Sequence, residues 1–416
     1  MWRRVPAPKP ASFTLGILFA CSLASAITSA GPLVVGNNSH VVVMEYEAWF
    51  GPNAVTFQGT AAMPLLQSAD MQPLGGGYDS ADPHVIRQHV AWMEYMGIDA
   101  AISDLTNNVS CIFNTPWFAE KYLPFCTSGF RSSMQTIRDN TGNLYPAWTK
   151  LGTNLKLIPL LGGADETELY KDLDGKTAFE KEVDYFGALM QQYPDRQVIY
   201  EGKPLMLIFL GAAQDPCRSD NPLWLQITKF LTSHPEIGEK YTFRMMAGYL
   251  DSQPYLWLNP GKADGPEEIN PGYDFWSWVD RLKTSCAQPY CPYYPTFNKI
   301  SSDGSRVENM TASIATAGAY GWGCPNENAL PYCPDDALRF GANGTNGTYE
   351  TFSSFMTYAS ELEPIFLMVH QFNEFVPPDE GFDANTDDDI EPANLWGFGA
   401  LDAVQEQIAI YRDQEK

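Results

Sequence analysis

Short apolar runs alternate with stretches of helical spacing along most of the chain. Continuously apolar runs bounded by polar residues are typical of strands buried on both faces, and apolar residues every three or four positions are typical of helices. The first pattern predicts strands at residues 40–46, 98–102, 155–161, 204–210, 241–249 and 365–372. The second predicts helices at residues 85–96, 179–193, 223–231 and 399–411. We therefore expect an α/β protein with a parallel sheet covered by helices.

Two observations select the type of α/β fold. No G-x-G-x-x-G turn follows the first strand, and the chain has 416 residues. Both favour a (β/α)8 TIM barrel over a doubly wound sheet. The Pro-rich and Cys-containing residues 273–334 are expected to form large loops on the barrel. We predict a single catalytic domain over residues 31–416.

The N-terminus has the three parts of a secretory signal. Arg3, Arg4 and Lys9 precede an apolar run at residues 13–23, and small residues follow at positions 24, 26, 29 and 30. This pattern predicts a signal peptide over residues 1–26, with cleavage as late as residue 30. The apolar run is too short for a stable membrane anchor. We expect a secreted, extracellular protein without a membrane segment.

Composition narrows the partners. The 26 basic residues face 50 acidic ones, which gives a net charge of -24 and argues against nucleic acid and anionic membranes as partners. Aromatic residues make up 13% of the chain and charged residues only 18%. That balance suits aromatic contacts with neutral polar ligands, of which sugars are the obvious kind. A monomer is expected.

Cysteines and sequons fit export. Cys21 leaves with the leader, and local spacing suggests three disulfides, Cys111 with Cys126, Cys286 with Cys291, and Cys324 with Cys333, with Cys217 left over. No paired C-x-x-C spacing supports zinc instead. Glycosylation is predicted at the five N-x-S/T sequons, Asn37, Asn108, Asn309, Asn343 and Asn346.

Polar residues at strand ends are the leading site candidates, because active sites of (β/α)8 barrels lie at the carboxyl ends of the strands. The strand ending near residue 369 is followed by His370, Asn373 and Glu374. Glu374 is the first candidate for a catalytic carboxylate, with Asn373 and His370 beside the substrate. The first two strands end with Glu47 and Asp104. Each of these acids has a plainer alternative, as a loop carboxylate or a helix cap.

Three stretches carry a family resemblance. Phe372-Asn373-Glu374-Phe375, followed by Ile390-Glu391-Pro392, resembles the S-F-N-E-W and I-E-P signature of family 99 glycoside hydrolases, the endo-α-mannosidase type, and their WbsX-like relatives. The segment from Tyr78-Asp79-Ser80-Ala81-Asp82-Pro83 through Trp92 to Asp99 is similar to another of their motifs, as is Gly202-Lys203-Pro204-Leu205. The resemblance implies a (β/α)8 barrel and a retaining glycosidase. It adds Tyr78 and Asp79 as candidate substrate contacts.

One departure affects the mechanism. The family has a second catalytic Glu three residues after the first, and here that position is Pro377. The second carboxylate must then come from elsewhere, or the activity is lost or different. The candidates are Glu45, Glu47, Asp104, Asp379, Glu380 and Glu391. Glu45 and Glu47 share one face if their strand continues, since strand side chains alternate. No cofactor is required by this chemistry.

Aromatic and acidic loops supply further candidates. Trp49, Trp276 and Trp322 are candidate sugar platforms, with burial in the core as the alternative for each. Asp383, Asn385 and Asp387 reproduce the first ligands of a calcium loop. Asp388 and Asn394 stand where an EF-hand needs Gly and Glu, so only a non-standard structural calcium site or a solvated loop remains.

The sequence thus predicts a secreted glycoside hydrolase acting on a neutral polysaccharide or glycan. An α-mannan is the first substrate by resemblance, and a fungal wall glucan is the second, because the secreted family 71 α-1,3-glucanases are distant look-alikes. Pro377 motivates an alternative, a catalytically inactive carbohydrate-binding relative. A glycosyltransferase-like protein is a third reading, disfavoured because a secreted protein meets no activated sugar donor.

Overall fold

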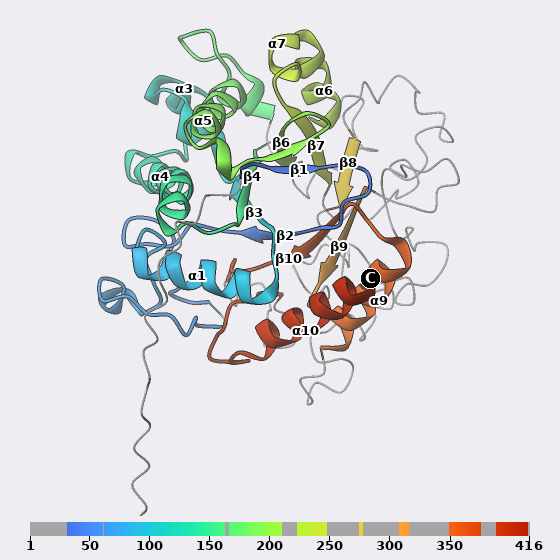
Figure 1. The fold of residues 1–416 in the computed structure, drawn as a ribbon. Helices are drawn as coiled ribbons and strands as arrows, with labels where there is room; N and C mark the ends of the chain where they lie inside the picture. Colours follow the sequence, from blue (N-terminus) through green and yellow to red (C-terminus); the bar gives the residue numbers. More distant parts are fainter. Residues whose placement is uncertain are drawn as a thin grey trace, which may run out of the picture.

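The computed structural model describes residues 31–60, 62–162, 166–209, 223–247, 274–277, 308–315, 349–375 and 388–414. Within these ranges, parallel strands form one continuous path in the order β9, β10, β2, β3, β4, β6, β7, β8. Strands β8 and β9 at the two ends of this path contact each other. Helices surround the strands in Figure 1. The predicted (β/α)8 barrel is confirmed.

The barrel strands are short. Their bounds are β2 Val41–Tyr46, β3 Ala100–Leu105, β4 Lys156–Leu161, β6 Lys203–Phe209, β7 Thr242–Ala247, β8 Asp274–Ser277, β9 Asn309–Ser313 and β10 Phe366–His370. Alternate residues serve two cores. In β2, Val41 and Val43 pack inside the barrel, whereas Val42 and Met44 pack against the helix layer. Both faces of β2 are therefore buried, which explains its continuously apolar run.

The helices begin and end where local signals predict. Helix α1, Pro83–Met96, is capped by the Asp82 carboxylate, which accepts a hydrogen bond from the backbone N–H of His84, and it ends at Gly97 in the left-handed conformation. Helix α5, Ala178–Gln192, opens with a capping box between Thr177 and Glu180. The others are α2 Val109–Phe113, α3 Pro116–Tyr122, α4 Ser128–Leu151, α6 Leu223–Ser233, α7 Pro235–Gly238, α9 Glu350–Leu362 and α10 Gly399–Gln414, with 3-10 turns η1 Gln72–Leu74, η2 Glu166–Leu169 and η3 Pro194–Arg196.

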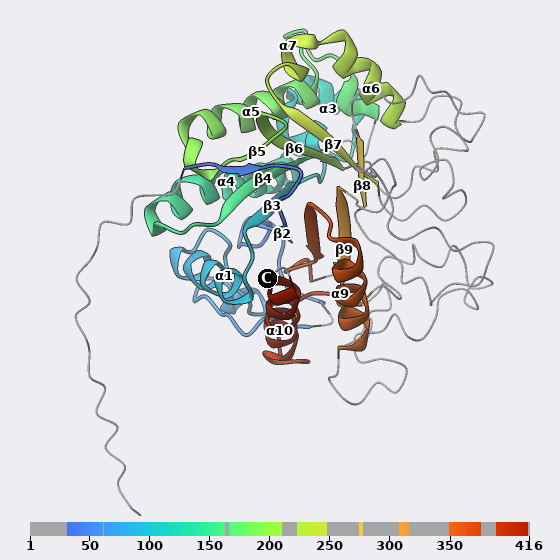
Figure 2. The ribbon, with the colours of Figure 1, turned by 45° about the vertical axis from the view of Figure 1, so that its right-hand side comes forward.

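Two strands lie outside the barrel path. Strand β1, Leu33–Val35, pairs in parallel with β5, Val198–Tyr200, and β5 pairs antiparallel with β6. Figure 2 shows β5 close to β4 and β6. Val35, Val198 and Tyr200 join the same core as the inward residues of the barrel strands. The pair thus covers the amino-terminal end of the barrel.

A buried ion pair fills the same end. Arg244 of β7 and Glu308, just before β9, are 2.6 Å apart between Nε and Oε1. The Trp276 indole N–H donates to the same carboxylate at 2.7 Å, and Trp276 is fully buried against Phe366. The expectation that Trp276 is a sugar platform is therefore wrong. Its alternative, burial in the core, is what the structure has.

One disulfide prediction lies on described residues and is confirmed. Cys111 of α2 bonds to Cys126 after α3, closing a loop with a sequence separation of 15. The sequons at Asn37 and Asn108 are exposed. Asn309 is 2% exposed inside β9, so a glycan has no room there in the folded chain, and that expectation is wrong. Buried strand positions cannot carry so bulky a group.

Several expectations fall outside the described residues. They are the signal peptide at residues 1–26 with its cleavage as late as residue 30, and Cys217, Cys286, Cys291, Cys324, Cys333, Asn343, Asn346, Trp322, Pro377, Asp379, Glu380, Asp383, Asn385 and Asp387. The single domain over residues 31–416 likewise stays a prediction. In the part of the chain that is described, no helix combines the length and the apolar character needed to cross a bilayer.

Candidate active site

Carboxylates gather where the neighbouring strands β2 and β3 end, beside the end of β10. Glu45 and Glu47 belong to the end of β2, and Asp104 belongs to the end of β3, its parallel neighbour. One oxygen from each of these three acids lies within 4.8 Å of the others. All three side chains are buried. The expectation that Glu45 and Glu47 share one face is confirmed by this grouping.

His370, the last residue of β10, adds a positive charge. Its Nδ1 is 2.8 Å from a carboxylate oxygen of Glu45, and its Nε2 is 3.1 Å from Asp388. The second contact is an ion pair without hydrogen-bond alignment. Burial alone would lower the pKa of His370, but the two carboxylates outweigh it and raise the pKa to about 9. His370 is therefore an imidazolium at neutral pH.

Glu47 is held by its backbone and carries a free oxygen. The Asn373 side chain accepts a hydrogen bond from the Glu47 N–H at 3.0 Å and donates one to the Glu47 carbonyl at 2.9 Å. The carboxyl is 1% exposed, and its Oε2 has no hydrogen-bond partner among the described residues. Burial, followed by the charges of Glu45, Asp104, Glu374 and Asp389, raises its pKa well above the ordinary value. Glu47 therefore holds a proton where an exposed Glu would not.

Asp104 is tied to the loop that follows β3. Its Oδ1 accepts hydrogen bonds from the Thr106 N–H at 2.8 Å and from the Thr106 hydroxyl at 2.9 Å. Burial and the charge of Glu45 outweigh these bonds and raise the pKa of Asp104 to about 8. The half-buried Trp49 donates its indole N–H to the Asp104 carbonyl at 3.3 Å. Trp49 thus lies next to the end of β3 while packing against the core, and its contact with substrate stays a prediction.

Glu374 is the more accessible acid of this group. It follows β10 by four residues and is only half-buried. The Gln371 side-chain amide donates to its carboxylate. Asp389 fixes the turn by accepting the backbone N–H of Glu374 at 2.5 Å and of Phe375 at 2.9 Å. The Glu374 carboxylate is therefore held at the carboxyl end of the barrel, close enough to Glu47 to raise its pKa.

Glu391 belongs to a different cluster, and its assignment as a catalytic acid is wrong. Its Oε2 accepts a hydrogen bond from the Tyr78 hydroxyl at 2.6 Å, and its Oε1 lies 3.2 Å from His89 Nε2. Tyr78 and Ile390 pack in the layer between strands and helices, and Glu391 has no exposed surface. Both oxygens are therefore engaged in anchoring the loop after β10 to α1.

Four expected substrate contacts support the site from behind instead. Tyr78, Asn373 and His370 are fully buried, with their polar groups bonded to protein. Asp79 is half-buried, and its Oδ1 accepts the Ala81 N–H at 2.9 Å in the turn before α1. Because their polar groups are bonded to protein, these three side chains have a positioning role in the structure, and a direct substrate contact by them stays a prediction. Asp79 has a local structural role.

Sequence reasoning missed several residues of the site. Asp389, Gln371 and His89 are not among the residues predicted for the site, and Asp388 enters the prediction only as a departure from the calcium-loop pattern. Their contacts join residues more than ten positions apart, such as Asp389 with Glu374. The acidic run 387–389 after an apolar strand was the available signal. Its pairing with His370 needed the fold.

The arrangement has more negative than positive groups. Among the described residues, Glu45 and Asp388 flank the imidazolium of His370, and Glu47, Asp104 and Glu374 add three further acids. Protons on buried members relieve this repulsion, as the raised pKa values of Glu47 and Asp104 show. The oxygens of Glu45, Glu47 and Asp104 are also those that could hold a cation. A protonated acid beside an ionised one is the pairing used in general acid–base catalysis.

No family profile matches the sequence, and no curated protein matches it either. Among solved structures, the chain is similar to a family 99 endo-α-mannosidase from Bacteroides thetaiotaomicron, with 12% identity, 91% of this chain and 99% of that chain covered, and a TM-score of 0.46. It is also similar to a glycoside hydrolase-like protein, with 13% identity, 90% and 96% covered, and a TM-score of 0.40. The family named from the motifs is thus among the similar structures, and at these identities no activity follows from them.

Proposed function

We propose that the protein is a glycoside hydrolase in which Glu374 and Glu47 are the two working carboxyl groups. The observation that carries the proposal is the contrast between them. Glu47 is buried with a raised pKa and a free oxygen, whereas Glu374 is half-exposed at the carboxyl end of the barrel. Two carboxyl groups whose environments differ in this way divide into an acid and a base or nucleophile.

The chemistry assigns one step to each group. Glu47 donates its proton to the glycosidic oxygen, so that the leaving sugar departs as an alcohol. Glu374 acts at the anomeric carbon, either by attacking it or by taking a proton from the attacking water. The anomeric configuration of the released sugar distinguishes these two routes: retention indicates direct attack and inversion indicates the water route.

The substrate class follows from the sequence. The N-E and I-E-P motifs favour an α-mannan, and a fungal wall glucan is the next choice. The predicted N-terminal leader agrees with this choice, because a secreted enzyme would meet such polymers outside the cell. The net charge of -24 favours a neutral polymer over an acidic one.

Pro377 supports a second candidate function. Because it stands where the related motif has its second Glu, the alternative is a carbohydrate-binding protein without turnover. The two functions differ in what Glu374→Gln changes. A hydrolase loses turnover and keeps binding, whereas a binding protein has no turnover to lose.

The test is product release from α-mannans, α- and β-glucans and fungal wall extracts, with wild type and Glu374→Gln compared. Glu361→Gln, on the exposed side of α9, is the matched control. We expect a loss of about 10²- to 10⁴-fold in Glu374→Gln and none in the control. Equal release by wild type and Glu374→Gln would remove Glu374 from the mechanism. Glycan binding without product from any variant would favour the second function. Activity that a chelator abolishes would indicate a metal mechanism instead.

A further inference from the structure

Exposed aromatic side chains cluster on the loops after β3 and β4. Trp117 and Tyr122 of α3 are 40% and 36% exposed, and Tyr170, just after η2, is 37% exposed. The ring centroids of Trp117 and Tyr122 are 6.4 Å apart, and those of Tyr122 and Tyr170 are 5.5 Å apart. We call these three residues the aromatic rim. Contiguous exposed aromatics on a soluble protein mark an interaction site more often than chance exposure does.

The aromatic rim lies on the same end of the barrel as the carboxylates. The segment carrying α2 and α3 connects the end of β3 to α4, and Asp104 is the fifth residue of β3. The segment carrying η2 and Tyr170 connects the end of β4 to α5. Loops that leave the carboxyl ends of barrel strands form the catalytic face. The aromatic rim is therefore continuous with the face that holds the proposed active site.

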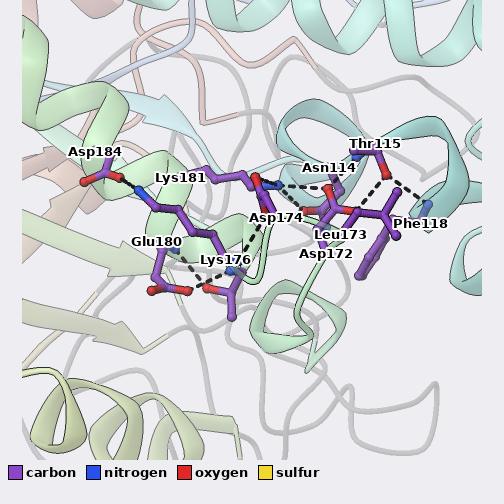
Figure 3. A network of polar contacts seen from close by, with 11 residues as sticks. Asn114, Thr115, Phe118, Asp172, Leu173, Asp174, Lys176, Glu180, Lys181 and Asp184 are labelled. Carbon is purple, nitrogen blue, oxygen red and sulfur yellow. Dashed lines mark hydrogen bonds and ion pairs between the residues drawn. The ribbon is translucent and has the colours of Figure 1, made fainter.

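The two loops are bonded to each other and are held in place. The Thr167 hydroxyl of η2 donates a hydrogen bond to the Ser110 hydroxyl of α2 at 3.1 Å. The Asp172 carboxylate accepts hydrogen bonds from the Thr115 N–H and hydroxyl, both at 2.7 Å, and from the Lys181 ammonium at 2.8 Å, as Figure 3 shows. The Cys111–Cys126 disulfide closes the loop around α3. A ligand that binds the aromatic rim thus meets a surface that is already ordered, which saves the entropy of ordering it.

The chemistry of the aromatic rim fits sugar rings. Tyr and Trp present apolar ring faces together with a polar tip, which matches a sugar with C–H groups on its ring faces and hydroxyls at its edge. Lys121 lies 4.9 Å from the Trp117 ring and 4.6 Å from the Tyr122 ring, where its ammonium can donate to sugar hydroxyls.

We infer that the aromatic rim binds outer sugar units of a polysaccharide chain whose cleavage point lies at the carboxylates. The inference rests on the proposed function and deepens it, because it makes the substrate a polymer long enough to reach both places. A short glycan would occupy the carboxylate site alone. The enzyme should therefore prefer long chains over short oligosaccharides of the same linkage.

The test separates binding from turnover. The triple variant combines Trp117→Ala, Tyr122→Ala and Tyr170→Ala, and it is made both in wild type and in Glu374→Gln. The control is Tyr95→Ala, since Tyr95 is 52% exposed on α1. Polymer affinity is measured in the Glu374→Gln background. The polymer is the polysaccharide that gives product with wild type, or each polysaccharide of the panel if none gives product. We expect about tenfold weaker polymer binding in the triple variant, the size of effect produced by losing one or two stacked rings. The control should bind as before. In the active background, KM for the polymer should rise by the same factor, and kcat/KM for a short oligosaccharide should stay unchanged.

Three results would overturn the inference. The first is unchanged polymer binding in a folded triple variant. The second is an equal loss of kcat/KM on the polymer and on the short oligosaccharide. The third is a wild-type dimer in sedimentation that the triple variant no longer forms. The last result would make the aromatic rim a contact between copies. Circular dichroism checks the fold, and Trp117→Phe, which keeps an aromatic face, should retain most of the binding. If the proposed function fails but polymer binding still depends on the aromatic rim, the binding part of the inference stands alone.

Discussion

The two ends of the barrel both bury charge, but they balance it differently. At the amino-terminal end, Arg244 meets the buried carboxylate of Glu308 at 2.6 Å, and the exposed Glu201 lies 3.0 Å away. Tyr200 packs against the guanidinium at 5.2 Å. At the carboxyl end, one imidazolium, His370, faces Glu45 and Asp388, with further acids beside them.

The difference teaches where function lies in this fold. A matched pair with its hydrogen bonds satisfied is costly to break and leaves no group available to react. A surplus of acids around one cation forces some of them to keep protons, and Glu47 keeps one with a free oxygen. Strongly shifted carboxyl groups in a cleft are costly for stability and useful for catalysis. The predictions below test this contrast, from the largest expected effect to the smallest.

At the carboxyl end, Glu47→Gln should act on turnover and spare the fold. An amide cannot donate the proton, so activity should fall by about 10²- to 10⁴-fold. The free energy of unfolding should stay level or rise, because Glu47 must take up a proton when the chain folds at neutral pH and Gln does not. Activity assays and urea unfolding measure the two quantities. A variant that unfolds while its specific activity is unchanged would contradict the assignment.

At the amino-terminal end, Arg244→Met should do the opposite. Glu308 is left buried without its cation, which should cost about 3–5 kcal/mol of unfolding free energy. Urea unfolding is the measurement, and specific activity of the folded fraction should be unchanged. The double variant Arg244→Met/Glu308→Gln should recover much of the loss, since no buried charge is left unpaired. A double variant as unstable as the single one would show that packing, not charge, sets the cost.

His370 should make stability depend on pH. Its pKa is about 9 in the folded protein against an ordinary 6.5. A raised pKa means that the folded state binds the proton more tightly, so the stabilisation is complete below pH 6.5 and is lost as pH rises through 9. About 3 kcal/mol should be lost over that window. Thermal unfolding across pH 6 to 10 should show the decline in wild type and a smaller one in His370→Gln. The remaining slope belongs to groups such as Asp104, whose pKa of about 8 acts in the same direction.

Asp172→Asn should give the smallest effect, away from both ends. Asp172 joins α3 to α5 through Thr115 and Lys181, and these partners lower its pKa to about 2 although burial opposes them. Its stabilisation is present above pH 3.8 and is lost as pH falls through 2. The substitution should cost about 1–3 kcal/mol at neutral pH, the cost of weakening hydrogen bonds to a charged group. Chemical unfolding at pH 7 and pH 2.5 should show the gap between variant and wild type narrowing at the lower pH.

Much of the fold was predictable from the sequence, and the exceptions have physical reasons. Strands β2, β4, β6 and β10 are apolar on both faces, so their runs were visible. Strands β8 and β9 were missed because they are short and carry polar residues such as Asp274 and Thr311. Helix α4 was missed because it is rich in Ser, Thr and Asn and contains Pro146.

The candidate site was predictable in part. Glu47, Asp104 and Glu374 follow apolar strands, and the ordering of parallel strands brings such positions together. Which acids face inward was not visible, since Glu391 also follows β10 yet lies behind the strands with Tyr78. The contact of Glu391 with His89 of α1 decides this. Long-range contacts of that kind leave no local pattern in the sequence.

The most direct test of the central claim is the pH dependence of kcat/KM for wild type and Glu47→Gln on the polysaccharide that gives product. The raised pKa of Glu47 predicts that wild-type activity holds well above pH 4.5 and falls only as the acid loses its proton. The residual activity of Glu47→Gln should lack this fall. A wild-type fall centred near pH 4.5, or the same fall in Glu47→Gln, would contradict the assignment of Glu47 as the acid.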